Sequence, residues 1–108
     1  MMMSGKQTFN GTEYTKFVIQ AKCAPTCRLN VYGSYSAPGF NVNLWTSSLN
    51  DTQDWIFEPA PGYKSGYYII RSANKPSCVL APAGTSNSSN VQLATYKKGN
   101  TNQIWYVG

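Results

Sequence analysis

Four carboxylates are the acid–base groups that this sequence offers for catalysis, because the chain contains no histidine. They are Glu13, Asp51, Asp54 and Glu58. The missing imidazole excludes a histidine-activated nucleophile, a histidine general base and a histidine metal site. Glycoside hydrolysis needs two carboxylates on either side of the cleaved bond, and the closeness of Asp51 and Asp54 in the sequence gives no reason to expect that geometry. No phosphate-binding glycine loop or metal-ligand cluster occurs. We predict a protein that is not an enzyme and that uses no cofactor or metal.

The three cysteines leave at least one thiol unpaired within the chain. Cys23 and Cys27 bracket Ala-Pro-Thr and could close a small disulfide ring in an oxidising compartment. Three free thiols in a reducing compartment is the equal alternative. The first residues lack the apolar segment of a signal peptide, so the compartment is left open.

Length and composition indicate one small all-β domain. The chain has 108 residues, only 12% of them charged, and is rich in asparagine, serine, threonine and glycine. Such a composition favours turns and strands over helices. Its apolar runs are far shorter than the roughly 18 residues of a membrane-spanning helix, so no membrane insertion is expected.

An internal repeat of about 50 residues organises the chain. Asn41-Val42-Asn43-Leu44-Trp45-Thr46 returns as Asn90-Val91-Gln92-Leu93-Ala94-Thr95, and the Gln53-Asp54-Trp55 triplet returns as Gln103-Ile104-Trp105. Lys16–Gln20 likewise matches Gly66–Arg71, and Leu29-Asn30-Val31 matches Cys78-Val79-Leu80. Each repeat therefore carries four short strand-like segments. We divide the chain into an N-terminal extension (1–13), repeat 1 (14–59) and repeat 2 (60–108).

Strand alternation predicts which side chains point inward. In repeat 1, Leu29, Val31, Val42 and Leu44 should be buried, with Asn30, Tyr32, Asn43 and Trp45 on the outer face. In repeat 2, Val91 and Leu93 should be buried and Gln92 and Ala94 should face outward. Trp45 is thus a candidate exposed aromatic that has no counterpart in repeat 2. Trp55 with Phe57, and Trp105 with Val107, are expected to anchor the core.

Four strands per repeat, ending in Gln-x-Trp, resemble the ricin-B-type β-trefoil lectins and carbohydrate-binding modules. The resemblance runs from about Tyr14 to Gly108, with Gly39 ahead of the Val42–Trp45 strand and Asn102 directly before Gln103. It implies a β-trefoil fold, in which three such repeats surround a pseudo-threefold axis. It also implies shallow sugar pockets, one for each repeat, for galactose-type or xylose-type ligands.

The resemblance places a sugar pocket in repeat 1. In this family an acid accepts hydrogen bonds from sugar hydroxyls, an aromatic ring stacks on the sugar and an Asn-Gln pair completes the pocket. The matching positions hold Asn30 for the acid, Trp45 for the ring and Gln53, with Thr52 in place of asparagine. Asn50 or Asp51 could compensate for the acid, and Tyr32 could line the same pocket.

Repeat 2 keeps less of the pocket pattern. Asn102 and Gln103 fit it, while Ala94 replaces the ring and Val79, or Ala81 in a shifted register, replaces the acid. We expect this weaker second pocket not to bind sugar. Gln53 and Gln103 are expected mainly to hold the loops before the core tryptophans through side-chain hydrogen bonds.

Two repeats make an incomplete trefoil, since residues 1–13 are too few to supply a third. Exposed strand edges and apolar faces favour association, so a dimeric or trimeric homo-oligomer that completes the fold by exchange is one expectation. A partner chain, a longer parent protein and an adapted two-repeat fold are the alternatives.

The net charge of +5 supports a second class of function. Positive charge attracts polyanions such as sulfated glycans, but the basic residues are scattered from Lys6 to Lys98 and no nucleic-acid partner is expected. The alternative to a lectin is therefore a protein-interaction or polyanion-binding trefoil with degenerate sugar pockets.

Overall fold

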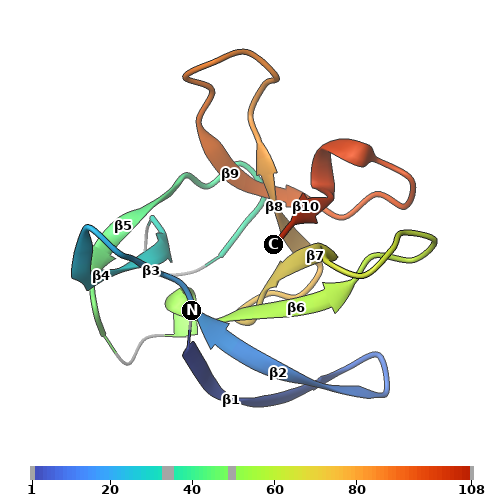
Figure 1. Cartoon of the computed structure of the whole chain (residues 1–108), viewed down its shortest axis with the longest axis horizontal. Helices are drawn as coiled ribbons and strands as arrows, with labels where there is room; N and C mark the ends of the chain where they lie inside the picture. The colour runs from blue at the N-terminus through green and yellow to red at the C-terminus, as the bar shows by residue number, and fades with distance from the viewer. Residues whose placement is uncertain (1, 33–35, 49–50, 108) are drawn as a thin grey trace.

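The described part of the chain forms ten β-strands and two short 3-10 helices (Figure 1). The computed structural model describes residues 2–32, 36–48 and 51–107. The strands are β1 (Met2–Phe9), β2 (Thr12–Val18), β3 (Gln20–Ala21), β4 (Ala24–Val31), β5 (Val42–Thr46), β6 (Trp55–Pro59), β7 (Tyr67–Ser72), β8 (Cys78–Pro82), β9 (Val91–Thr95) and β10 (Trp105–Tyr106). The helices η1 (Asp51–Gln53) and η2 (Thr101–Gln103) directly precede the two core tryptophan strands. The predicted all-β class is confirmed.

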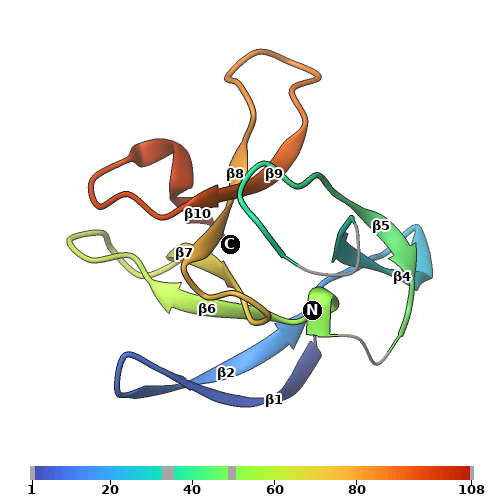
Figure 2. The same cartoon turned by 180° about the vertical axis from the view of Figure 1, so that it is seen from behind.

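The strands form two sheets in which neighbouring strands are antiparallel. The larger sheet has the order β1-β2-β6-β7-β8-β9, with β10 paired to β7, and the smaller sheet has the order β3-β4-β5. Figures 1 and 2 show the hairpins β4–β5 and β8–β9 as two arms around the centre of the molecule, with the hairpin β1–β2 next to β6. None of the described residues forms a helix long and apolar enough to cross a membrane.

The two repeats have the same strand plan. In repeat 1, β2 pairs with β6 through Phe17 and Trp55, and in repeat 2, β7 pairs with β10 through Tyr68 and Trp105. Between these strands each repeat carries one hairpin, β4–β5 or β8–β9. The predicted repeat of four strand segments is therefore present in three dimensions, and this is the strand plan of a β-trefoil repeat.

Pairing within the hairpins corrects the alignment of the second strand by two residues. Leu29 pairs with Leu44, and Leu80 pairs with Leu93. The carbonyl of Leu29 accepts the indole N–H of Trp55 at 3.2 Å, as the carbonyl of Leu80 accepts that of Trp105 at 2.8 Å. Leu29 therefore corresponds to Leu80 and not to Cys78. It follows that Ala81, the shifted-register alternative, occupies the position of Asn30.

Most of the residues assigned to an N-terminal extension form a strand of the larger sheet. Met2–Phe9 pairs with β2 from Met2 opposite Val18 to Phe9 opposite Thr12, with a register shift between Met3 and Gly5. The connection is Asn10-Gly11, whose φ angles of 50° and 78° give the doubly left-handed turn that Asn-Gly favours in hairpins. Because β1 pairs with β2 as β6 pairs with β7, β1 takes the position of the fourth strand of a preceding repeat.

The core lies between the two hairpins and the strands that carry the tryptophans. Trp55, Val31 and Leu93 are fully buried, as predicted, whereas Trp105 is only partly buried and packs against this cluster. Two predictions of burial were wrong. Leu44, expected inside, is 47% exposed, because β5 is the edge of its sheet. Asn30, expected outside, is only 8% exposed, because η1 packs over β4 and places Thr52 against its amide.

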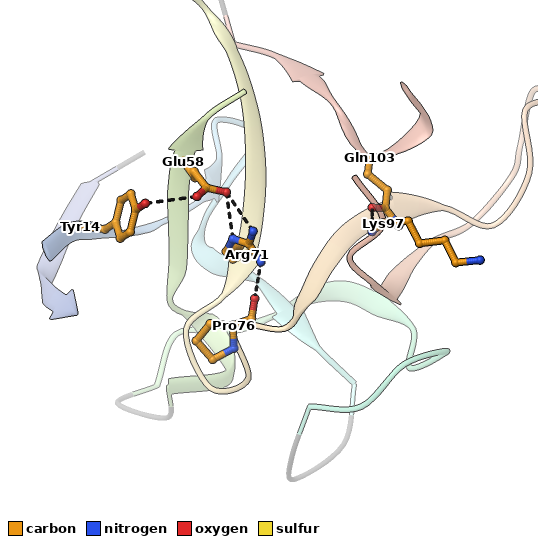
Figure 3. Close-up of polar contacts among 6 residues, drawn as sticks. All are labelled: Tyr14, Glu58, Arg71, Pro76, Lys97 and Gln103. Atoms are coloured by element: carbon orange, nitrogen blue, oxygen red, sulfur yellow. Dashed lines mark hydrogen bonds and ion pairs between the residues drawn. The ribbon is translucent and has the colours of Figure 1, made fainter. Parts of the chain in front are cut away.

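A buried ion pair ties β6 to β7 (Figure 3). The guanidinium of Arg71 donates to Oε1 of Glu58 at 3.1 and 3.0 Å and to the carbonyl of Pro76 at 2.8 Å. Rings of Phe9 and Tyr96 lie 4.7 and 4.6 Å from the guanidinium carbon. Arg71 is therefore satisfied within the fold, and its charge contributes little to the outer surface.

Candidate functional site

The amide of Gln53 holds the loop that follows β5. Its Oε1 accepts the backbone N–H of Ser48 at 3.0 Å, and its Nε2 donates to the carbonyl of Thr46 at 2.9 Å. Gln53 can reach both groups because η1 turns the chain back toward the end of β5 before Trp55 enters the core. The side chain is 1% exposed, so its predicted role in holding the loop is confirmed.

Gln103 makes the same pair of contacts in repeat 2. Its Oε1 accepts the backbone N–H of Lys97 at 2.9 Å (Figure 3), and its Nε2 donates to the carbonyl of Thr95 at 3.0 Å. The helix η2 is capped by Asn100, whose side chain accepts the N–H of Asn102. The Gln-x-Trp motif is thus a structural element in both repeats, independent of any ligand.

Two aromatic side chains of repeat 1 are exposed beside this loop. Trp45 on β5 is 57% exposed and Tyr32, just after β4, is 61% exposed. The alternation along β5 predicted the exposure of Trp45, and this is confirmed. A large ring left in water beside a polar loop is a feature of ligand-binding surfaces, because its face can pack against an apolar surface of a ligand.

A hydrogen-bond network runs through Asn30. The hydroxyl of Thr52 donates to Asn30 Oδ1 at 3.2 Å, and Asn30 Nδ2 donates to Asn43 Oδ1 at 3.2 Å and to the carbonyl of Val31 at 3.0 Å. These contacts fix the orientation of the Asn30 amide. Its oxygen has a second lone pair that can still accept from a ligand.

These side chains surround one shallow cavity of about 380 Å³. It is lined by Asn30, Tyr32, Trp45, Thr46, Ser47, Ser48, Thr52 and Gln53. The structure therefore brings four of the five residues proposed for the pocket together, namely Asn30, Tyr32, Trp45 and Gln53. The fifth, Asn50, lies outside the described residues.

Asp51, the other candidate to compensate for the missing acid, does not line the cavity. Its carboxylate accepts a hydrogen bond from Asn74 Nδ2 at 3.0 Å. The described lining residues are aromatic, amide and hydroxyl side chains, which can pack against and hydrogen-bond a neutral ligand that offers hydroxyl groups. Among the residues described, no cluster of acids and cysteines could hold a metal ion, and Cys23, Cys27 and Cys78 are all free thiols.

Sequence reasoning missed part of the polar rim. Thr46, Ser47 and Ser48 line the cavity, and Thr52 takes part through its hydroxyl. Their contribution depends on the path of the loop after β5. Gln53 sets this path by its hydrogen bonds to the backbone of Thr46 and Ser48. Both repeats have a threonine at the end of the third strand segment, Thr46 after Trp45 and Thr95 after Ala94. This shared threonine was a sequence signal for a common loop geometry, but it did not indicate a ligand.

The second pocket predicted in repeat 2 lacks the ring and the amide. Ala94 stands at the position of Trp45, and the corrected register places Ala81 opposite Gln92 as Asn30 lies opposite Asn43. Asn102 is exposed, and Gln103 is buried with both amide atoms engaged by the loop. Repeat 2 therefore retains the scaffold of the pocket without its recognition groups.

Comparisons with known proteins support the fold. No protein-family model and no curated protein matches the chain. Among solved structures, the crystal structure of ThreeFoil, a designed three-fold symmetric protein, matches with a TM-score of 0.73 and 25% sequence identity. The match covers 84% of this chain and 62% of that chain, so this chain spans less than two thirds of the designed protein. The chain has a β-trefoil fold.

Proposed function

We propose that this β-trefoil is a carbohydrate-binding module of the ricin-B lectin type, with its working pocket in repeat 1. The observation that carries the proposal is the cavity that the exposed ring of Trp45 lines together with the hydrogen-bonded side chains of Asn30 and Thr52. A pyranose presents an apolar C–H face on one side and paired hydroxyls around its rim. The cavity offers an aromatic platform for the first and fixed polar partners for the second.

The neutral lining supports galactose-type or xylose-type ligands over acidic sugars. An amide at Asn30 makes weaker hydrogen bonds than the carboxylate usual in the family, by about a factor of two. We therefore expect weak binding of single sugars and stronger binding where several residues of a glycan touch Trp45 and Tyr32. We expect binding without turnover, and in support, Asp51 and Asp54 are engaged by Asn74 and Lys16.

Titration with galactose, lactose and xylo-oligosaccharides, followed by tryptophan fluorescence, tests the proposal. Trp45 is the exposed reporter, since Trp55 is fully buried and Trp105 is partly buried. Trp45→Ala should abolish saturable binding measured by calorimetry, a readout that does not depend on the removed fluorophore, and it should leave stability nearly unchanged because most of the ring is already in water. Tyr106→Ala is the matched control, because Tyr106 is 66% exposed on β10 and does not line the cavity. A sugar response that survives Trp45→Ala would contradict the proposal.

Salt dependence separates this proposal from the polyanion alternative. Three of the nine basic side chains, those of Lys6, Lys16 and Arg71, are in ion pairs with carboxylates, so the net charge of +5 comes from the six other basic side chains and Asp51. Binding of a neutral sugar should change little between low and physiological salt, whereas binding of heparin-like chains should weaken steeply. Binding of sulfated glycans alone, lost with salt and unaffected by Trp45→Ala, would favour the alternative.

A further inference from the structure

The two repeats are joined by a backbone contact between a loop of repeat 1 and a strand of repeat 2. The N–H of Gly39 donates to the carbonyl of Leu93 at 2.7 Å, and the N–H of Leu93 donates to the carbonyl of Phe40 at 2.9 Å. Asn41 and Gln92 form the bridge that continues this contact. The joint thus consists of a loop, residues 39–41, and the strand edge at Leu93 on which the loop docks. We call the loop the donor loop and the strand edge the acceptor side, although the two backbone hydrogen bonds run in opposite directions.

The chain holds a second copy of each half of this joint. Leu44 corresponds to Leu93, and β5 is the edge strand of its sheet, so its acceptor side has no strand partner among the described residues. Ser88 and Ser89 correspond to Gly39 and Phe40. Ser88 has a φ of 68°, close to the 86° of Gly39, although a serine in this region is strained. The loop of repeat 2 therefore has the left-handed backbone found in the donor loop of repeat 1.

Burial differs between the repeats at the positions that such a joint would cover. Leu93 is fully buried, while its counterpart Leu44 is 47% exposed. Trp55 is fully buried, while its counterpart Trp105 is only partly buried. Leu93 lies where the loop of repeat 1 docks, whereas Leu44 and Trp105 line a cleft. Side chains of core type are thus left open on one side of the molecule.

This open side contains an uncharged cleft of about 420 Å³ between the two hairpins. Leu29, Leu44, Leu80, Val91 and Trp105 line it, and Ser89 and Asn90 of the free donor loop lie at its rim. Strand pairing is incomplete as well, since within the described residues β1 and β10 each pair with a single neighbouring strand. Because β1 already takes the position of a fourth strand, three strands would complete a third repeat.

We propose that the open side is a docking site for a third trefoil repeat, supplied as a segment of three short strands like β7–β9. The first strand would lie between β10 and β1, and the following hairpin would fill the cleft. Its loop would bind the edge of β5 at Leu44, and its third strand would receive the loop at Ser88 and Ser89. The match covers 62% of a three-fold symmetric protein, so the part of that protein left unmatched is about the size of one repeat.

A peptide with the sequence of residues 64–97, which contains β7–β9, is the probe. Titrated into the full chain, it should bind with 1:1 stoichiometry by calorimetry and sedimentation. Leu44→Lys in the full chain should weaken binding by about 10- to 100-fold, the factor that burial of a leucine side chain contributes. Thr95→Lys is the matched control, because Thr95 is exposed on β9 and does not line the cleft. Leu93→Lys in the peptide should abolish binding.

A covalently extended chain provides a second measurement, for the case in which the free peptide aggregates. Residues 61–97 are appended after Gly108, and the Tm should rise by at least about 5 °C. Leu44→Lys should then lower the Tm of the extended chain and leave that of the parent nearly unchanged. Absence of both peptide binding and the Tm rise would overturn the proposal. So would self-association of the parent that Leu44→Lys abolishes, because a second copy would then cover the cleft.

Discussion

Replacing Gln53 by alanine separates the scaffold of the site from its recognition groups. The side chain is 1% exposed and makes two hydrogen bonds, at 3.0 Å to Ser48 N–H and at 2.9 Å to the Thr46 carbonyl. Loss of a buried partner costs about 1–3 kcal/mol for each polar group affected. We expect the free energy of unfolding to fall by about 2–4 kcal/mol, which corresponds to a Tm about 10–20 °C lower in a chain of this size.

The sugar response should also weaken in this variant, because Thr46 and Ser48 line the cavity and lose the group that holds them. Gln103→Ala is the matched control. It removes equivalent bonds to Lys97 N–H and the Thr95 carbonyl, at 2.9 and 3.0 Å, and neither of these residues lines the cavity. It should cost similar stability and leave sugar binding intact when titrations are run well below the Tm. Urea unfolding and fluorescence titration measure both effects. A Gln53→Ala variant within about 0.5 kcal/mol of the parent, or equal loss of binding in both variants, would refute the reasoning.

Three further predictions concern groups away from the cavity. Arg71→Ala should lower the free energy of unfolding by about 3 kcal/mol in urea, because it leaves the Glu58 carboxylate and the Pro76 carbonyl without their cation; a loss below 1 kcal/mol would contradict the role of the ion pair. Burial, followed by the charge of Glu58, raises the pKa of Tyr14 above its ordinary 10.0. Its contribution to stability is fully present below the pKa of unfolded tyrosine and is lost as the pH rises through the folded value. Phenolate absorbance should therefore show a late component that Tyr14→Phe removes. Cys78 is 1% exposed and Cys23 is exposed, so a thiol reagent should modify Cys23 in the native protein and Cys78 only after unfolding; native modification of Cys78 would be inconsistent with the packing.

Local pattern was sufficient to predict the parts of the site that depend on one strand or one loop. Alternation along β5 predicts the exposure of Trp45, and the repeated Gln-x-Trp predicts that Gln53 holds a loop. The hairpin β1–β2 could also have been predicted from the sequence, because Asn10-Gly11 favours a tight hairpin turn. Treating residues 1–13 as an extension overlooked this signal.

Predictions failed where a residue depends on a distant element. Period-two alternation states which way Leu44 points, but whether that face is covered depends on a neighbour for β5. Asn30 points to the outer face of β4, yet η1 returns to cover it, with Thr52 donating to its amide from 22 positions away. The second strand of repeat 2 was misaligned for a related reason. Its register is set by Leu93 and by the indole of Trp105, both far along the chain.

The two repeats differ in two independent ways, and this makes their functions separable. Near the cavity the backbone contacts are equivalent and the side chains differ, since Gln53 and Gln103 make the same bonds while Trp45 is replaced by Ala94. At the open side Leu44 and Leu93 are chemically the same, and their environments differ. The difference near the cavity is a difference in amino-acid sequence, so repeat 1 would keep the residues of its cavity whatever covers the open side. The second comes from a missing neighbour, so docking there can change stability and assembly without altering the residues that line the pocket.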